Sequence, residues 1–366
     1  MAEARPEAAT STAADLPGPP LTPPLTDWTL RPFEAVSVSP LWVGAALALG
    51  FWTLCAGVRL TIGGGEFGTR GEALVRNPYF WMDLLNGVLF AYVPSAVFVL
   101  RRGALRDLRD LRPSLAVADD RFRKLAEETV CVAPHRLALA GAGFGIALGL
   151  LPVYDPNIWG TGERPDLLDP FMIFMIARHA ALGWLLGHAV ITEVHLATSY
   201  ARLGADHVRV DLLDQRPLRP FARRGLRSAF AWILYSSLIS LFWLGPAPGS
   251  SNAAILAGLF LVLILGFLLG VSGVRDSIHR AKREKLDGLR DAIRRESERV
   301  LDAPAPGEPG SARLASLIAY QGLVERVREW PFDAPVLLRL AVYALLGVLS
   351  WLGGALVERL LDDALR

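Results

Sequence analysis

Long apolar stretches separated by short blocks of charge are the feature that most limits what this chain can fold into. The 366 residues are 52% hydrophobic and only 20% charged, and most of the charges lie between the apolar stretches. A helix needs about 20 apolar residues to cross a bilayer core of about 30 Å, because each residue adds about 1.5 Å. Seven stretches meet this requirement within a few residues: 41–62, 80–100, 136–153, 171–197, 226–246, 253–274 and 336–356.

This pattern excludes a soluble enzyme with one ordinary core, a disordered chain and a disulfide scaffold. It predicts an all-α integral membrane protein, a seven-span helical bundle in a lipid bilayer. Six spans form a bundle over residues 41–274, and the seventh span with a short tail occupies 333–366. Eighteen uncharged residues separate Arg339 from Glu358, which is enough to cross the bilayer. A re-entrant or interfacial helix is the alternative for this last stretch.

The distribution of positive charge predicts the orientation, since Lys and Arg in short loops stay in the cytoplasm. The connections 101–133, 199–227 and 275–332 hold eight, seven and twelve Lys and Arg residues. The intervening connections 63–79, 154–169 and 247–252 hold two, one and none. We therefore expect the inner membrane, an N-terminus in the cytoplasm and, if the seventh stretch crosses, a C-terminus outside.

Residues 1–40 contain eight prolines and many Ala, Ser and Thr residues, and no stretch typical of a signal peptide. Such a composition cannot bury a core, so we expect a disordered cytoplasmic tail. The stretch from Trp28 to Phe33 is expected at the membrane interface, which tryptophan favours.

Cysteine and lysine usage removes several function classes. Cys55 and Cys131 are expected on opposite sides of the bilayer, which is incompatible with a disulfide. The chain has no Cys/His spacing typical of zinc sites and no phosphate-binding, dinucleotide-binding or hydrolase motif. Its three lysines lie outside the apolar stretches, which excludes a retinal protein. We expect no cofactor, no metal, no catalytic activity and no nucleic-acid partner.

A long amphipathic pattern follows the sixth span, and a second follows a linker rich in Pro and Gly. Together they predict a cytoplasmic helical hairpin over residues 275–332. The hairpin is expected either to form a homo-oligomer or to bind a cytoplasmic partner at 275–330, and the alternative is a simple connection between two spans. The apolar positions are Leu286, Leu289, Ile293 and Val300 in the first helix, and Leu314, Leu317, Ile318, Leu323, Val324 and Val327 in the second.

Small residues mark faces where helices approach closely, because glycine has no Cβ. The third span carries three glycines at intervals of four, and the sixth carries a similar pair. Close packing within one molecule is favoured over a dimer motif. The glycines are Gly141, Gly145, Gly149, Gly266 and Gly270.

The fourth span is unusual because it contains several ionisable residues: Arg178, His179, His188, Glu193 and His195. These residues lie on two opposite faces of the helix. Such a helix cannot face lipid along its whole length, so we expect it inside the bundle. His188, Glu193 and His195 are expected near the inner boundary. Arg178 lies deeper and needs a partner, a water-filled path or an anionic ligand.

Asp83 and Asn86 in the second span are the predicted partners of Arg178. Two readings remain open: a ligand or permeation site lined by Arg178, His179, His188, Asp83 and Asn86, or a structural ion pair between two helices. Ser237 belongs to a stripe of hydroxyl groups in the fifth span that could face the same path. Serine hydroxyls also bond to their own helix carbonyls, which is the commoner arrangement.

Ionisable residues at membrane depth indicate a functional site by default. The sequence therefore predicts an oligomeric channel or transporter with a polar site on the fourth span. The alternative is a non-transporting sensor or scaffold that acts through its cytoplasmic helices.

Overall fold

The computed structural model describes residues 27–36, 38–62, 78–154, 166–241, 250–302 and 309–330, with a few more between 338 and 345. Every regular element in these ranges is helical, and the one β-bridge is isolated, so the all-α prediction is confirmed. The longer helices are α2 (Pro40–Ile62), α3 (Pro78–Leu111), α4 (Asp119–Val130), α5 (Pro134–Gly149), α7 (Pro170–Asp206), α8 (Arg219–Ser240), α9 (Ser250–Asp302) and α10 (Pro309–Glu325). The short ones are η1 (Trp28–Leu30), α1 (Arg31–Ala35), η3 (Arg112–Ser114), α6 (Leu151–Tyr154) and η5 (Arg216–Leu218).

Five helical segments among the described residues are long and apolar enough to cross a membrane. They contain the second, third and fourth predicted spans and most of the first and the sixth. The fifth predicted span forms helix α8 as far as Ser240, and its last residues lie outside the described ranges. The seventh, 336–356, lies almost wholly outside them. The five segments are Pro40–Arg59, Phe80–Ser114, Asp119–Tyr154, Pro170–Asp206 and Gly258–Leu301.

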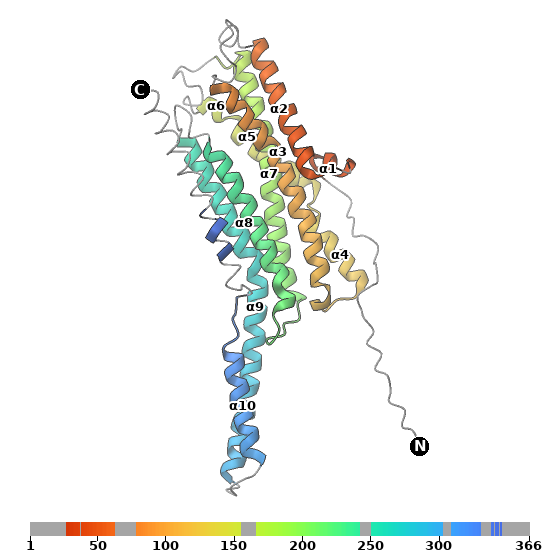
Figure 1. Cartoon of the computed structure of the whole chain (residues 1–366), viewed down its shortest axis with the longest axis vertical. Coiled ribbons are helices and arrows are strands. Elements are labelled where there is room, and N and C mark those ends of the chain that lie inside the picture. Colours follow the sequence, from red (N-terminus) through yellow and green to blue (C-terminus); the bar gives the residue numbers. More distant parts are fainter. Residues whose placement is uncertain are drawn as a thin grey trace.

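Helix α7 lies at the centre of the bundle, where it packs against α5, α9 and α3 (Figure 1). Glycines on both sides of the α5–α7 contact let the two backbones approach. A Cβ on Gly141 would lie 2.9 Å from the Trp184 ring, and one on Gly145 would lie 3.2 Å from the carbonyl oxygen of Ala180. A Cβ on Gly149 would lie 3.0 Å from the Cβ of Ala180. The glycine faces of the third span are therefore used for packing within the molecule.

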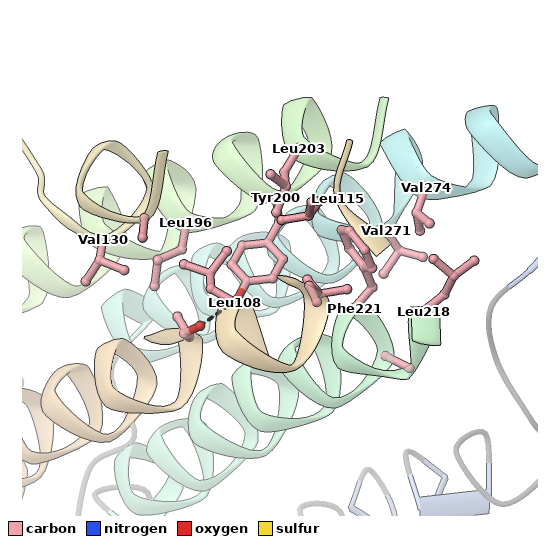
Figure 2. Close-up of a cluster of buried hydrophobic side chains, with 14 of the residues drawn as sticks. Leu108, Leu115, Val130, Leu196, Tyr200, Leu203, Leu218, Phe221, Val271 and Val274 are labelled. Carbon is pink, nitrogen blue, oxygen red and sulfur yellow. Dashed lines mark hydrogen bonds between the residues drawn. The ribbon is translucent and has the colours of Figure 1, made fainter. Parts of the chain in front are cut away.

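Two connections rich in arginine meet at one end of the bundle. The bridge between Leu115 and Val208 joins the connection after α3 to the connection after α7. Beside it lies the largest cluster of buried apolar side chains, shown in Figure 2, with Tyr200 and Phe221 at its centre. The Tyr200 hydroxyl donates to the carbonyl oxygen of Ala104 at 2.9 Å, which ties α7 to α3.

Helix α9 runs far beyond this end of the bundle, and α10 lies alongside its projecting part (Figure 1). The Nζ of Lys282 donates to the carbonyl oxygen of Val327 at 3.0 Å, and Leu289 and Val324 are buried. The two helices therefore pack against each other along the projecting part of α9.

Residues 27–36 differ from the expected disordered tail. They form η1 and α1, and the side chains of Leu30 and Phe33 are buried. The Phe33 ring stacks on Phe98 of α3 with 5.5 Å between centroids. Apolar residues among the prolines allow this part of the chain to pack, and residues 1–26 lie outside the described ranges.

Candidate functional site

Helix α7 carries buried polar and charged side chains at successive positions along its length. Arg178, His188, Thr192 and Glu193 are all less than one-tenth exposed. At about 1.5 Å per residue, Arg178 and Glu193 lie about 22 Å apart along the helix axis. The candidate site is therefore a column of polar groups, with three charged contacts at different heights.

The first contact joins three helices through Asp83. The Nη1 of Arg178 on α7 donates to Oδ1 of Asp83 on α3 at 2.7 Å. Arg59 on α2 donates to the same carboxylate from Nε at 2.8 Å and from Nη2 at 2.9 Å. All three side chains are 5% exposed or less. The predicted pair of Arg178 and Asp83 is thus present, and Arg59 joins it.

Aromatic rings cover the arginines of this contact. The Phe171 ring lies 5.1 Å from the guanidinium of Arg59, and the Phe174 ring lies 5.9 Å from that of Arg178. Cations over aromatic faces gain about 0.5–2 kcal/mol, more when water is excluded. These rings help to offset the cost of removing the two arginines from water.

The other residues predicted for this part of the site bond within their own helices. The amide nitrogen of Asn86 donates to the Met82 carbonyl oxygen at 2.9 Å. The Nδ1 of His179 lies 2.7 Å from the carbonyl oxygen of Met175. The Ser237 hydroxyl donates to the carbonyl oxygen of Ile233 at 2.9 Å. The structure therefore brings Arg178 and Asp83 together and shows no bond from these three side chains to that pair.

The second contact joins His188 to Asp27, a residue just before η1. The Nδ1 of His188 lies 3.4 Å from Oδ1 of Asp27, and both side chains are buried. The same oxygen accepts from the backbone nitrogen of Thr29 at 3.1 Å and from its hydroxyl at 2.6 Å. Burial alone would raise the pKa of the Asp27 carboxyl, but His188 and the Thr29 donors together hold this pKa below its ordinary value.

The third contact joins α7, α8 and α9 through Glu193 and Arg224. The Nη2 of Arg224 lies 2.7 Å from Oε1 of Glu193, and the two side chains are 3% and 1% exposed. The Nη1 of Arg224 also donates to the Gly266 carbonyl oxygen at 2.9 Å. A Cβ on Gly266 would lie 2.6 Å from Oε1 of Glu193, and one on Gly270 would overlap the Arg224 guanidinium. The two glycines of the sixth predicted span thus make room for a buried ion pair.

Glu193 and His188, expected near the inner boundary, are both buried inside the bundle and contact other elements. His195 does lie at a partly exposed position, where its Nε2 is 2.9 Å from the Glu128 carbonyl oxygen. A further charged contact, between Asp107 and the arginines Arg223 and Arg227, lies near the cluster around Tyr200.

Several buried polar atoms along the column have no hydrogen-bond partner among the described residues. Such an atom costs about 1–3 kcal/mol, so folded proteins keep few of them. The atoms are Nε of Arg178, both ring nitrogens of His188, Oδ2 of Asp27, Oγ1 of Thr192, Oε2 of Glu193, Nη1 of Arg101 and Nε1 of Trp184 and Trp232.

The described residues contain no group of three or more His, Cys, Asp or Glu side chains placed to hold a metal ion. Sequence reasoning found Arg178 and Asp83 because a charge inside an apolar stretch is conspicuous. It missed Arg59, which lies near the end of the first apolar stretch, and Asp27 and Arg224, which lie outside the apolar stretches.

Comparison with known proteins gave no match to a family model, to a curated protein or to a solved structure. The function must therefore be inferred from the geometry of the chain itself.

Proposed function

We propose that this chain is a multi-pass inner-membrane protein that acts as a channel or transporter, and that an ion passes along the polar column of α7. Five sufficiently long apolar helices and the arginine-rich connections at one end of the bundle support this topology. The proposal includes seven spans, a cytoplasmic N-terminus and no catalytic activity.

The polar atoms without partners on α7 are the observation that carries the proposal. A helix that used its charges only to lock neighbouring helices would satisfy both sides of each pair. Here Arg178, His188 and Glu193 each keep at least one unpartnered atom at a different height. Ionisable groups spaced in this way across a bilayer are typical of ion and proton pathways.

The test is ion flux through proteoliposomes that contain the purified chain and a potassium chloride gradient, with cation and anion movement recorded separately. Arg178→Ala is expected to change the rate or the selectivity of the flux. Arg290→Ala, which removes an exposed arginine of the α9 hairpin, is the matched control and should leave the flux unchanged. Absence of flux in the wild-type protein, or unchanged flux in a folded Arg178→Ala variant, would contradict the proposal.

A second candidate function, a non-transporting scaffold or sensor, is favoured by the projecting hairpin of α9 and α10. Ile318 and Leu323 of α10 are 54% and 58% exposed, so this helix presents large apolar side chains away from α9. A second copy of the chain could cover them and form a homo-oligomer. The double variant Ile318→Asp/Leu323→Asp should then lower the mass measured in detergent, whereas an unchanged mass would contradict this role.

A further inference from the structure

His188 is the most poorly satisfied side chain of the polar column. The residue is 4% exposed, and neither ring nitrogen has a hydrogen-bond partner among the described residues. A neutral imidazole carries one donor and one acceptor, and of the two ring nitrogens only Nδ1 faces a polar group, the Asp27 carboxylate. A protonated imidazole carries two donors and a positive charge, and an anionic oxygen already lies 3.4 Å from its Nδ1.

The position of the ring is fixed by its neighbours. The Trp184 ring, one turn earlier on α7, lies 5.3 Å from the His188 ring between centroids. A Cβ at Gly141 of α5 would lie 3.0 Å from Cδ2 of His188 and 2.9 Å from the Trp184 ring, so the backbone of α5 is close to both rings. The ring is therefore held beside Asp27 rather than free to turn toward α5.

One charged group contacts His188 directly, and a second acts on that group. Asp27 is the acidic group in contact with it, and Oδ2 of Asp27 has no partner among the described residues. Arg101 of α3 donates to the Val130 carbonyl oxygen from Nε and Nη2, and it interacts electrostatically with Asp27 and Glu34.

The neighbouring ionisable groups of α7 are already bonded elsewhere. Glu193 is paired with Arg224, and His195 lies against the Glu128 carbonyl oxygen. The α5 face contributes Gly141, and α8 contributes Trp232 to the adjoining apolar cluster, so neither brings a charge. Asp27 is thus the carboxylate placed to stabilise a positive charge on His188, and Arg101 opposes it.

We propose that His188 and Asp27 form a proton-binding site, in which His188 takes up one proton from the aqueous phase. The neutral ring becomes an imidazolium, its Nδ1–H donates to the Asp27 carboxylate, and the 27–36 segment is held more tightly against α7. No other bond forms or breaks. This site goes beyond the transport function proposed above, because proton binding does not depend on flux.

Trp184 provides a reporter beside the site. A positive charge on the adjacent imidazole quenches indole fluorescence, so the full chain in detergent should show a fluorescence step as the pH is lowered. Subtracting the signal of Trp184→Phe isolates this residue from the other nine tryptophans. The step should vanish in His188→Gln and persist in His195→Gln, a matched change two turns further along α7.

Asp27→Asn tests the pair independently of His188. Loss of the carboxylate should lower the proton affinity at least about tenfold, which moves the midpoint of the step at least about one unit to lower pH. If His188→Gln does not purify as a single species, the midpoint of the fluorescence step in Asp27→Asn decides whether the proposal holds. No step in the wild-type protein, an unchanged step in His188→Gln or an unchanged midpoint in Asp27→Asn would each overturn the proposal.

The two proposals fail in different ways. A fluorescence step without ion flux would support the proton-binding site and contradict the transport function. Ion flux without a fluorescence step would support the transport function and contradict the proton-binding site.

Discussion

Arg178 of α7 and Asp83 of α3 form a buried ion pair with 2.7 Å between Nη1 and Oδ1, although 95 residues separate them in the sequence. Arg59 of α2 bonds to both oxygens of the same carboxylate. One aspartate thus connects three helices of the bundle. Asp83 therefore matters whether this contact is a structural ion pair between helices or part of an ion path.

Asp83→Asn should be among the most damaging single changes in the chain. The amide has nearly the same shape as the carboxylate, but it leaves two buried guanidiniums without a counter-charge. Removing one member of a buried pair costs about 3–5 kcal/mol. The change can be measured as a lower thermal unfolding midpoint of the purified protein in detergent.

Asp110→Asn is the matched control, because Asp110 is a half-exposed partner of Arg223 at the end of the bundle. Exposed pairs contribute about 0–1 kcal/mol, so its midpoint should stay near that of the wild-type protein. Equal destabilisation by the two variants would show that burial does not decide the strength of the Asp83 contact.

The pair of Glu193 and Arg224 allows stability to be separated from function. Arg224→Met alone should destabilise the fold by about 3–5 kcal/mol, since Glu193 would lose its charge partner while its side chain stays 1% exposed. The double variant Glu193→Leu/Arg224→Met removes both charges and should unfold near the wild-type temperature. Ion flux in the double variant should nevertheless fall if the pair belongs to the path.

The result for this pair is informative in both directions. Wild-type flux in a stable double variant would make the pair purely structural. A double variant as unstable as Arg224→Met would contradict the view that the buried charges can be replaced together.

How far the sequence predicts this structure depends on how local each signal is. The apolar stretches predict the helices and the charged connections predict which helix ends lie together, because both follow from hydropathy along the chain. Arg178 is predicted to need a partner because its charge lies deep in an apolar stretch, and Asp83 is predicted as that partner because it lies near the outer start of the second span. The spacing of Gly141, Gly145 and Gly149 indicated a close helix contact, although not its partner, α7.

The other partners could not be found in this way. Arg59 lies near the end of its helix and Arg224 near the beginning of α8, where charge is unremarkable. Asp27 lies in a proline-rich stretch that resembles a disordered tail by composition. These pairings depend on how α2, α8 and the 27–36 segment pack against the rest of the bundle. No local sequence pattern predicts that packing.

Gly187→Ala should disrupt the contact between α5 and α7. The new Cβ would overlap the carbonyl group of Ala140, which belongs to the backbone and cannot turn away. Overpacking of this kind costs about 1–3 kcal/mol or more, and a lower unfolding midpoint should report it. Gly143→Ala is the control on α5, because nothing lies within 4 Å of its new Cβ. Similar midpoints for the two variants would contradict the close approach of these helices.

Val324→Asp should detach α10 from α9. Val324 is fully buried, and one turn later the Val327 carbonyl accepts the hydrogen bond from Lys282. A charge at this position cannot be solvated while the helices pack, and α10, with 17 residues, is only marginally stable alone. Hydrogen–deuterium exchange over residues 312–325 should therefore become fast, while α7 stays protected. Ile318→Asp, at a position that is 54% exposed, should leave this exchange slow. Equally slow exchange in both variants would mean that α10 does not depend on its contact with α9.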